Sequence, residues 1–267
     1  MDAKPPLSLA VSIVLYKMPM SAIAPLLADL QSAGVSKIIV VDNSPAGFDQ
    51  SGDPPRSGIV ERFRTGRNLG YGKAHNTAIR RSAGTYKYHL ICNPDIAIPE
   101  HAISSIMEFM EANPQIGLCM PKLVGTDGEI QYCCRRSPLA LDYLSQLLLP
   151  RTWGRRRRHA LEMRSCDYHQ RMEVPCLSGC FMFFRSDVLR RLGGFDERFF
   201  MYFEDFDLSL RSRAIAKNVY FPDTYVIHER QSAHKKSWRL KLTFARSACL
   251  YFCKWGWFAT RVPKASS

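Results

Sequence analysis

Polar side chains stand directly after three apolar runs that have the composition of buried β-strands. Tyr16 follows the first run. Asp42 and Asn43 follow the second, and Asn93 and Asp95 follow a third. Ligands of open parallel sheets bind beyond the carboxyl ends of the strands, so these residues are expected at one sheet edge. Each segment alone also fits an ordinary turn, but together they indicate contacts to a ribose, a base and a metal ion.

A glycine-rich segment lies between the second and third of these positions. It reads RNLGYGKAHN over residues 67–76, and Gly70 and Gly72 would allow a ligand to approach the backbone closely. No GxGxxG follows the first strand, and no glycine-rich loop ends in Gly-Lys-Ser/Thr. The pattern therefore excludes a dinucleotide fingerprint and a P-loop.

A second group of candidate residues lies in the last third of the chain. Glu204, Asp205 and Asp207 provide three carboxylates within four positions, directly after the apolar run FFMYF. One interpretation is capping, because a helix N-terminus favours negative charge. The other is chemical: a carboxylate at the rim of an apolar pocket can accept a proton from a substrate hydroxyl. His228 follows an Ile/Val-rich strand and is either structural or a metal ligand.

The first half of the chain alternates strand and helix signals, which predicts an α/β fold with a mainly parallel central sheet and helices on both faces. The expected strands are Leu7–Leu15, Lys37–Val41, Ile59–Arg64, Tyr88–Cys92 and Ile116–Met120. The expected helices are Ser21–Ser32, His75–Ser82 and Pro99–Asn113.

The second half is less regular. We expect a hairpin within Lys122–Gln131, an apolar helix over Leu139–Leu149 that runs into the Arg-rich residues 151–158, and a helix over Glu204–Lys217. Ser178–Arg185 is apolar, Ser186 caps a short helix, and Val219–Phe221 and Thr224–Ile227 have strand composition. A tail from Lys235 mixes basic and aromatic residues.

Composition narrows the class of protein. The chain has 267 residues, 46% of them hydrophobic, and a formal net charge of +13. This is the composition of a globular protein rather than a disordered one. No apolar run has the roughly 18–20 residues of a membrane span, and the run at Leu7–Tyr16 lacks a signal-peptide cleavage site. Nine cysteines without paired metal-ligand spacing indicate reduced thiols and a cytoplasmic location.

The positive charge is concentrated beside apolar residues. Arg151–Arg158 and His234–Lys241 are basic, and Tyr251–Phe258 adds two tryptophans. Tryptophan next to lysine and arginine is typical of segments that bind anionic membrane surfaces. The alternative is a solvated basic face with a tail helix packed on the domain. No helix-turn-helix, RNA-recognition or zinc-finger pattern supports nucleic acid as the partner.

Taken in order, these motifs resemble the family 2 glycosyltransferases of GT-A fold, and within them the bacterial rhamnosyltransferases of polysaccharide assembly. The resemblance runs from about Leu7 to Tyr251 and rests on VSIVLY, VVDNS, NLGYGKAHN, NPD, GGFDE, FFMYFEDFDL and VIH.

The resemblance implies a role for each matching residue. Asp205 would be the catalytic base, with Glu204 beside it. Asp95 and His228 would hold Mg²⁺ or Mn²⁺, although Asn93 stands where the family carries the first acid of its Asp-x-Asp motif. The nucleotide-binding residues would be Tyr16, Asp42, Asn43, Asn68, Gly70, Lys73 and Asn93.

The same resemblance implies an activity and an organisation. The activity is inverting transfer of a sugar, L-rhamnose from dTDP-rhamnose, onto a polyprenyl-diphosphate-linked glycan at the inner face of the cytoplasmic membrane. The alternatives are a UDP-hexose or UDP-hexosamine donor and a catalytically inert nucleotide-sugar binding module. Residues 1–233 would form the GT-A domain, with a nucleotide half (about 7–121) and an acceptor half (about 122–233), and residues 234–267 a helical tail.

Overall fold

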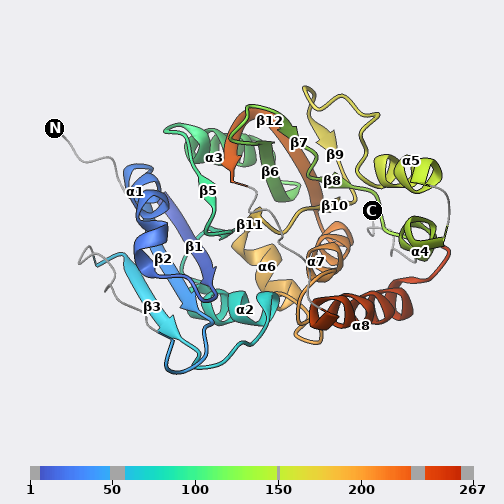
Figure 1. Ribbon diagram of the computed structural model, residues 1–267. Helices are drawn as coiled ribbons and strands as arrows, with labels where there is room; N and C mark the ends of the chain where they lie inside the picture. Colours follow the sequence, from blue (N-terminus) through green and yellow to red (C-terminus); the bar gives the residue numbers. More distant parts are fainter. Residues whose placement is uncertain (1–6, 49–57, 149–150, 230–237, 260–267) are drawn as a thin grey trace.

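The computed structural model describes residues 7–48, 58–148, 151–229 and 238–259. They form one mixed ten-stranded sheet flanked by helices (Figure 1). The main path of this sheet is β3 (Val60–Arg64), β2 (Val35–Asp42), β1 (Leu7–Leu15), β4 (Tyr88–Cys92), β11 (Phe181–Arg185), β6 (Ile116–Val124), β12 (Lys217–His228) and β5 (Ile96–Ala97). The predicted α/β architecture, with a mostly parallel central sheet, is confirmed.

Short strands complete the sheet, and two others lie outside it. β7 (Ile130–Gln131) pairs with β6, and β9 (Met172–Glu173) pairs with β12. β8 (Cys134–Arg135) and β10 (Cys176–Leu177) form a separate two-stranded sheet.

The centre of the sheet explains the near-continuous apolar runs. All five residues of β4 are buried, as are the last five of β2. Strands covered on both faces have no solvent side on which polar residues would be favoured. Within the centre of the sheet β11 interrupts the parallel order, because it runs antiparallel to both of its neighbours, β4 and β6. The short strands β5, β7 and β9 also pair antiparallel.

The helices follow the apolar periodicity, with differences at their ends. The structure has η1 (Met20–Ile23), α1 (Ala24–Ser32), α2 (Tyr71–Ser82), α3 (Ala102–Ala112), α4 (Ala140–Leu148), α5 (Arg151–Leu161), α6 (Ser186–Leu192), α7 (Glu204–Arg213) and α8 (Trp238–Trp255). α2 begins four residues before the predicted start at His75. Residues 151–158 lie in a helix of their own, α5, rather than in an extension of α4.

Two expectations near the C-terminal half are wrong. The helix predicted over Glu204–Lys217 ends at Arg213, and Lys217 already belongs to β12. The two predicted strands are parts of this one strand, which pairs with β6 on both sides of a register shift between Phe221 and Tyr225. The shift accommodates the Pro222-Asp223-Thr224 segment, which resembles a turn in sequence.

A second apolar cluster attaches α8 to the rest of the molecule. Phe203 and Leu210 from α7 and the turn before it pack with Tyr251, Phe252 and Trp255 of α8. The predicted tail is thus helical and docked over its described part. The predicted boundary at residues 233/234 and the basic residues His234, Lys235 and Lys236 lie outside the described residues. Among the described residues, no helix is both long and apolar enough to span a bilayer.

Candidate functional site

The antiparallel strand β11 brings the site together at the carboxyl edge of β4. Because β11 runs opposite to β4, its first residue, Phe181, pairs with Cys92, the last residue of β4. The Asn93 N–H donates to the carbonyl oxygen of Cys180 at 2.8 Å. The residues that follow β4 therefore meet the residues that precede β11.

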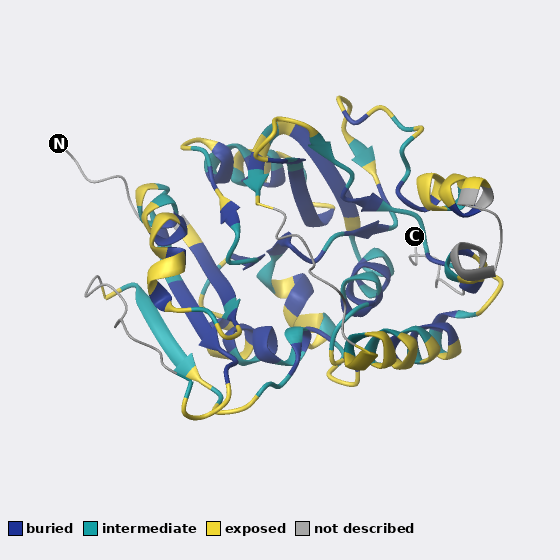
Figure 2. Cartoon of the chain, viewed as in Figure 1, coloured by how far each residue is buried: buried dark blue, intermediate teal, exposed yellow. Residues whose placement is uncertain are grey.

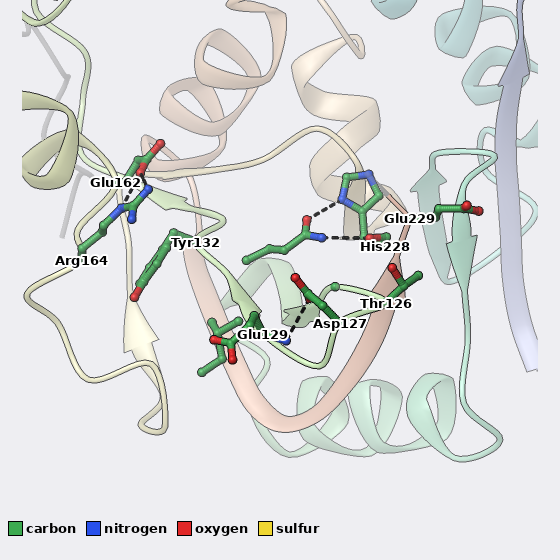
Figure 3. A pocket seen from close by; sticks show the side chains of 11 residues that line it. Thr126, Asp127, Glu129, Tyr132, Glu162, Arg164, His228 and Glu229 are labelled. Atoms are coloured by element: carbon green, nitrogen blue, oxygen red, sulfur yellow. Dashed lines mark hydrogen bonds and ion pairs between the residues drawn. The ribbon is translucent and has the colours of Figure 1, made fainter. Parts of the chain in front are cut away.

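Asp95 and His228 are adjacent because β5 pairs with the end of β12, with Ile96 opposite His228. The His228 Nε2 lies 3.5 Å from the Asp95 Oδ1. The His228 Nδ1 is 2.8 Å from the Oε1 of Gln131, which also donates through its Nε2 to the His228 carbonyl oxygen (Figure 3). Gln131 was not singled out by the sequence, and it holds the imidazole with Nε2 toward Asp95.

This pair has the chemistry of a partial divalent-cation site. The Asp95 Oδ1 is buried and has no hydrogen-bond partner. Among the described residues, no three His, Cys, Asp or Glu side chains converge on one point. Mg²⁺ is commonly held by one or two carboxylates together with substrate phosphates and water, so the residues fit a metal that binds with a phosphorylated ligand.

Asp205 and Glu204 are the first two residues of α7. Tyr202 and Phe203, directly before them, have positive φ angles of 71° and 68°. Such strained backbone in non-glycine residues persists only where the surroundings enforce it, and it occurs often at functional sites. The Asp205 carboxylate accepts the Gly179 N–H at 3.0 Å on Oδ2 and the Phe206 N–H at 2.9 Å on Oδ1.

The two carboxyl groups differ in how readily they ionise. Burial and the neighbouring Asp205 raise the pKa of Glu204 to about 8, and its Oε2 has no hydrogen-bond partner. Burial also raises the pKa of Asp205, but the N–H groups of Phe206 and Gly179 and the charge of Arg135 oppose that rise. Asp205 is therefore the better proton acceptor of the pair at neutral pH, while Glu204 carries a proton.

Tyr71 connects the two parts of the site and was not among the predicted residues. Its hydroxyl is 2.6 Å from the carbonyl oxygen of Gly179 and 3.0 Å from the Oδ1 of Asn93. The same Gly179 peptide donates its N–H to Asp205. A side chain at Gly179 would place its Cβ 3.2 Å from the Cβ of Asp205. The sequence signal for Tyr71 was its position between two glycines of the motif, Gly70 and Gly72.

Three of the predicted nucleotide-binding residues hold the loops at the edge of β2. Asp42 is fully buried, and its carboxylate pairs with Arg62 at 2.7 Å. Asn43 accepts the Leu69 N–H at 2.8 Å and donates to the Oδ1 of Asn68 at 3.0 Å. Tyr16, in contrast, is 47% exposed at the end of β1 and is available to stack on a ligand.

Gly70 and Lys73 have protein partners rather than open space around them. A Cβ on Gly70 would lie 2.2 Å from the carbonyl oxygen of Phe200, so this glycine lets the loop before α2 approach the loop before α7. This contact between loops accounts for a glycine at position 70, and its role in the approach of a ligand stays a prediction. The Lys73 ammonium pairs with Glu197 at 3.0 Å in a half-exposed ion pair.

A polar cavity of about 440 Å³ opens beside His228. Figure 3 shows that Asp127, Glu129 and Tyr132, from the β6–β7 hairpin and its continuation, line this cavity together with His228. Arg164 lies 4.4 Å over the ring of Tyr132. Carboxylates beside an aromatic ring are suited to a polyhydroxylated ligand, and none of these residues was predicted.

The sequence was compared with known proteins. The profile of the family described as "Glycosyltransferase like family 2" matches residues 38–246. The chain belongs to this family. An N-acetylglucosaminyl-diphospho-decaprenol L-rhamnosyltransferase of Mycobacterium tuberculosis is 27% identical over 208 residues, which cover 72% of this chain and 66% of that protein. The rhamnosyltransferase WbbL of Escherichia coli K12 is 26% identical over 222 residues, which cover 78% of this chain and 80% of that protein.

Solved structures give the fold. A mannosyltransferase from Pyrobaculum calidifontis, solved with GDP-Man and Mn²⁺, is similar with a TM-score of 0.57 and 17% identity, over 95% of this chain and 66% of that one. GalNAc-T7, solved with UDP, GalNAc and Mn²⁺, is similar with a TM-score of 0.60 and 14% identity, over 85% of this chain and 44% of that one. This family 2 glycosyltransferase therefore has the GT-A fold.

Proposed function

We propose that this protein is an inverting glycosyltransferase that moves L-rhamnose from dTDP-rhamnose onto a lipid-linked glycan. The observation that carries the proposal is the placement of the two groups of residues. Asp95, beside His228, follows the end of β4, and Asp205 accepts the N–H of Gly179, just before β11. Tyr71 links the two groups, because its hydroxyl contacts the Oδ1 of Asn93 and the carbonyl oxygen of Gly179, whose N–H donates to Asp205.

The reaction follows from the placement of Asp205. Its carboxylate accepts the proton of the acceptor hydroxyl while that oxygen attacks the anomeric carbon. The bond from that carbon to the diphosphate oxygen breaks on the opposite face, and the nucleoside diphosphate leaves. A positioned general base contributes roughly 10²–10⁴-fold to such a step.

Asp95 and His228 would hold a Mg²⁺ or Mn²⁺ ion together with the diphosphate of the donor. A bound divalent cation neutralises the charge that develops on the leaving diphosphate. Gln131 contributes by holding the His228 ring in place through its contact to Nδ1. Two relatives in fold were solved with Mn²⁺, which supports a divalent cation for this site as well.

The nucleotide would lie at the edge of β1 and β2. Tyr16 offers an exposed ring for the base, and Asn68 and Asn93 offer amides at the ends of the loops. Asp42, Asn43 and Gly70 would act there mainly by shaping these loops. Lys73 would reach the diphosphate only by leaving Glu197.

The acceptor is proposed from the curated relatives and from the chemistry of the surface. One relative is named for its action on a decaprenol-diphosphate-linked N-acetylglucosamine, which supports a polyprenyl-diphosphate-linked glycan here. Such an acceptor would place the protein peripherally on the inner face of the cytoplasmic membrane, with an anionic lipid surface as a partner. Residues 1–233 would form the catalytic domain, with nucleotide and acceptor halves as above, and residues 234–267 the membrane-proximal tail.

Two alternatives keep specific support. The fold relatives were solved with UDP and with GDP-Man, so a UDP-hexose or UDP-hexosamine donor is the second candidate. Asn93, in place of an acid, is what an inert nucleotide-sugar binding module would have, but the retained Asp205 and His228 favour an enzyme.

Thermal unfolding with dTDP, UDP, GDP or CDP, each with and without Mn²⁺, tests the donor. A ligand at about a hundred times its Kd stabilises the folded protein by roughly 2.7 kcal/mol. We expect the largest rise in Tm with dTDP plus Mn²⁺, and a smaller rise in the Asp95→Asn variant. A UDP-selective rise would favour the second candidate, and no rise with any nucleotide would contradict the proposal.

A further inference from the structure

An apolar groove of about 530 Å³ runs between α4 and α8. Its walls are Leu144 on α4, Phe244 and Phe252 on α8, and Trp257 after α8, with Ala248 at its floor. In its lining, the polar side-chain groups are the Tyr143 hydroxyl, the Cys249 thiol and the Trp257 indole N–H. The volume lies within the range of roughly 300–1,000 Å³ that is typical of small-molecule sites.

Much of the exposed apolar surface lies on the elements that form this groove. Nine large hydrophobic side chains are exposed among the described residues, and six of them lie on α4, α8 or the turn after α8. These six are Leu141, Leu144, Trp238, Leu242, Trp257 and Phe258. Of them, Leu144 and Trp257 line the groove itself. Exposed apolar surface of this kind marks binding sites when it is extensive.

One wall of the groove, α8, is basic, and so is α5, which packs beside the other wall, α4. α5 has the sequence RTWGRRRRHAL, and α8 has WRLKLTFARSACLYFCKW, so neither helix contains an acid. The acid of α4, Asp142, is buried and pairs with Arg136 and Arg157. Arg155 and Arg156 on α5 and Arg246 on α8 are exposed, and Figure 2 shows much of both helices in the colour of exposed residues. An apolar groove beside basic helices is complementary to an amphiphile with a hydrocarbon chain and an anionic head.

The groove adjoins the proposed proton acceptor. Tyr143, in its wall, packs against Phe203 with 5.3 Å between ring centroids. Phe203 directly precedes Glu204 and Asp205. Burial, and next the charge of Asp205, raise the pKa of the Tyr143 hydroxyl above its ordinary value. In a polyprenyl-diphosphate-linked acceptor the diphosphate alone separates the chain from the first sugar, so a first sugar bound at Asp205 would bring the chain toward this groove.

We propose that the α4–α8 groove binds the isoprenoid chain of the lipid-linked acceptor, with the diphosphate facing the basic helices. This inference rests on the proposed function, since it takes the acceptor to be a polyprenyl diphosphate. It adds a binding site for the part of the acceptor that does not react.

The test is binding of radiolabelled farnesyl diphosphate by equilibrium dialysis, without donor and without detergent. We expect saturable binding that is at least tenfold weaker in Ala248→Phe, which fills the groove, and weaker in Leu144→Gln, which removes an exposed part of the wall. Leu242→Phe, an exposed position of α8 outside the lining, should bind within about twofold of the wild type.

Unchanged binding in both groove variants would overturn the inference, and so would an equal loss of binding in Leu242→Phe. Binding of farnesyl diphosphate no tighter than that of inorganic diphosphate would overturn it as well. Loss of binding to anionic vesicles in Ala248→Phe with unchanged farnesyl diphosphate binding would also overturn it, in favour of a bilayer contact. Because this readout needs no sugar transfer, farnesyl binding as expected without turnover would contradict the proposed function alone.

Discussion

Two adjacent carboxyl groups with different surroundings are the centre of the proposed chemistry. Glu204 has a buried oxygen without a partner, whereas Asp205 accepts two backbone N–H groups. Neighbouring titratable groups whose environments separate their pKa values commonly divide acid and base roles between them. Here burial raises the pKa of both groups, and the two N–H groups and Arg135 oppose that rise for Asp205.

The raised pKa of Glu204 predicts a pH-dependent stability. The folded protein keeps this proton up to about pH 8, while the carboxyl of an unfolded Glu has an ordinary pKa of 4.5 and releases it near that pH. The folded state therefore binds more protons in that window, so the free energy of unfolding falls as pH rises from about 4.5 to 8. Glu204→Gln removes this fall in the free energy of unfolding, which amounts to at most about 1.4 kcal/mol for each pH unit.

Denaturant unfolding at pH 5, 7 and 9 measures this effect. The stability of Glu204→Gln relative to the wild type should rise from pH 5 to pH 7 and level off above about pH 8. Asp223→Asn is a suitable control, because Asp223 is exposed, pairs with Arg171, and has a pKa held below its usual value. Parallel pH profiles for Glu204→Gln and the wild type would contradict the assigned protonation.

Tyr71 is predicted to position Asp205 rather than to react. Burial keeps its pKa well above the ordinary value, so its hydroxyl stays protonated and donates. Tyr71→Phe removes a hydrogen bond with a net value of about 0.5–1.5 kcal/mol, which corresponds to a two- to tenfold lower kcat. The measurement is kcat and KM for the donor alongside Tm. A fall in Tm with unchanged kcat would reduce Tyr71 to a structural residue.

At the scale of elements, α7 carries the proposed proton acceptor, Asp205, in its first turn. Two positions later, Asp207 attaches this helix to α8. Asp207 is fully buried and pairs with Arg211 at 2.8 Å and with Lys254 at 2.6 Å. It also accepts the indole N–H of Trp255 at 2.9 Å. The third acid of the Glu204–Asp207 group therefore joins α8 to the catalytic helix.

Asp207→Ala should loosen α8 without removing a site residue. Two cations and one indole N–H lose this carboxylate, although Lys254 keeps Asp196 and Arg211 keeps two backbone carbonyl oxygens. Breaking a buried ion pair costs about 3–5 kcal/mol. Hydrogen exchange should accelerate first in α8. The change in Trp255 fluorescence on unfolding should be smaller than in the wild type. Asp223→Ala breaks an exposed pair and should cost under about 1 kcal/mol. Equal effects of the two substitutions would refute the anchoring role.

Local patterns predicted most elements and the residues at the strand ends. The central strands were found because strands buried on both faces are almost entirely apolar. Asp95 and His228 were named from sequence, and the structure places them 3.5 Å apart, while their metal-binding role stays a prediction. The continuity of β12 was missed because Pro222 and Asp223 resemble a turn, and only the pairing with β6 overrides them.

Contacts between distant segments could not be predicted. Tyr71 and Gly179 are 108 positions apart, and nothing in their local sequences indicates the hydrogen bond between them. The same holds for Gly70, whose missing side chain makes room for the backbone of Phe200. Gln131 is a further example, because its role depends on where the β6–β7 hairpin folds over His228.

For the whole molecule, the distribution of charge matters more than its sum. α4, α5 and α8 gather at one end, opposite to β3 (Figure 1). Each basic residue near an anionic membrane surface contributes about 1 kcal/mol. The basic, apolar end is therefore expected to face the membrane.

Sedimentation with anionic vesicles tests this orientation. The wild type should bind at low salt and dissociate as salt screens the charges. The double substitution Arg155→Glu and Arg156→Glu should weaken binding at least tenfold. Arg190→Glu with Arg191→Glu reverses the same charge on α6, which packs on β4 and β11, and should have a much smaller effect. Equal losses would show that only net charge matters.

The most direct test of the account is sugar transfer by Asp205→Asn, with nucleotide binding measured on the same preparation. Asparagine keeps the shape of the side chain and can still accept a backbone N–H, but it cannot take up the acceptor proton. We predict that transfer from dTDP-rhamnose to a prenyl-diphosphate-linked glycan falls by at least about 10²-fold. The Kd for dTDP with Mn²⁺ should stay within a few-fold of the wild-type value. Near-normal transfer by this variant would contradict the assignment of Asp205 as the base.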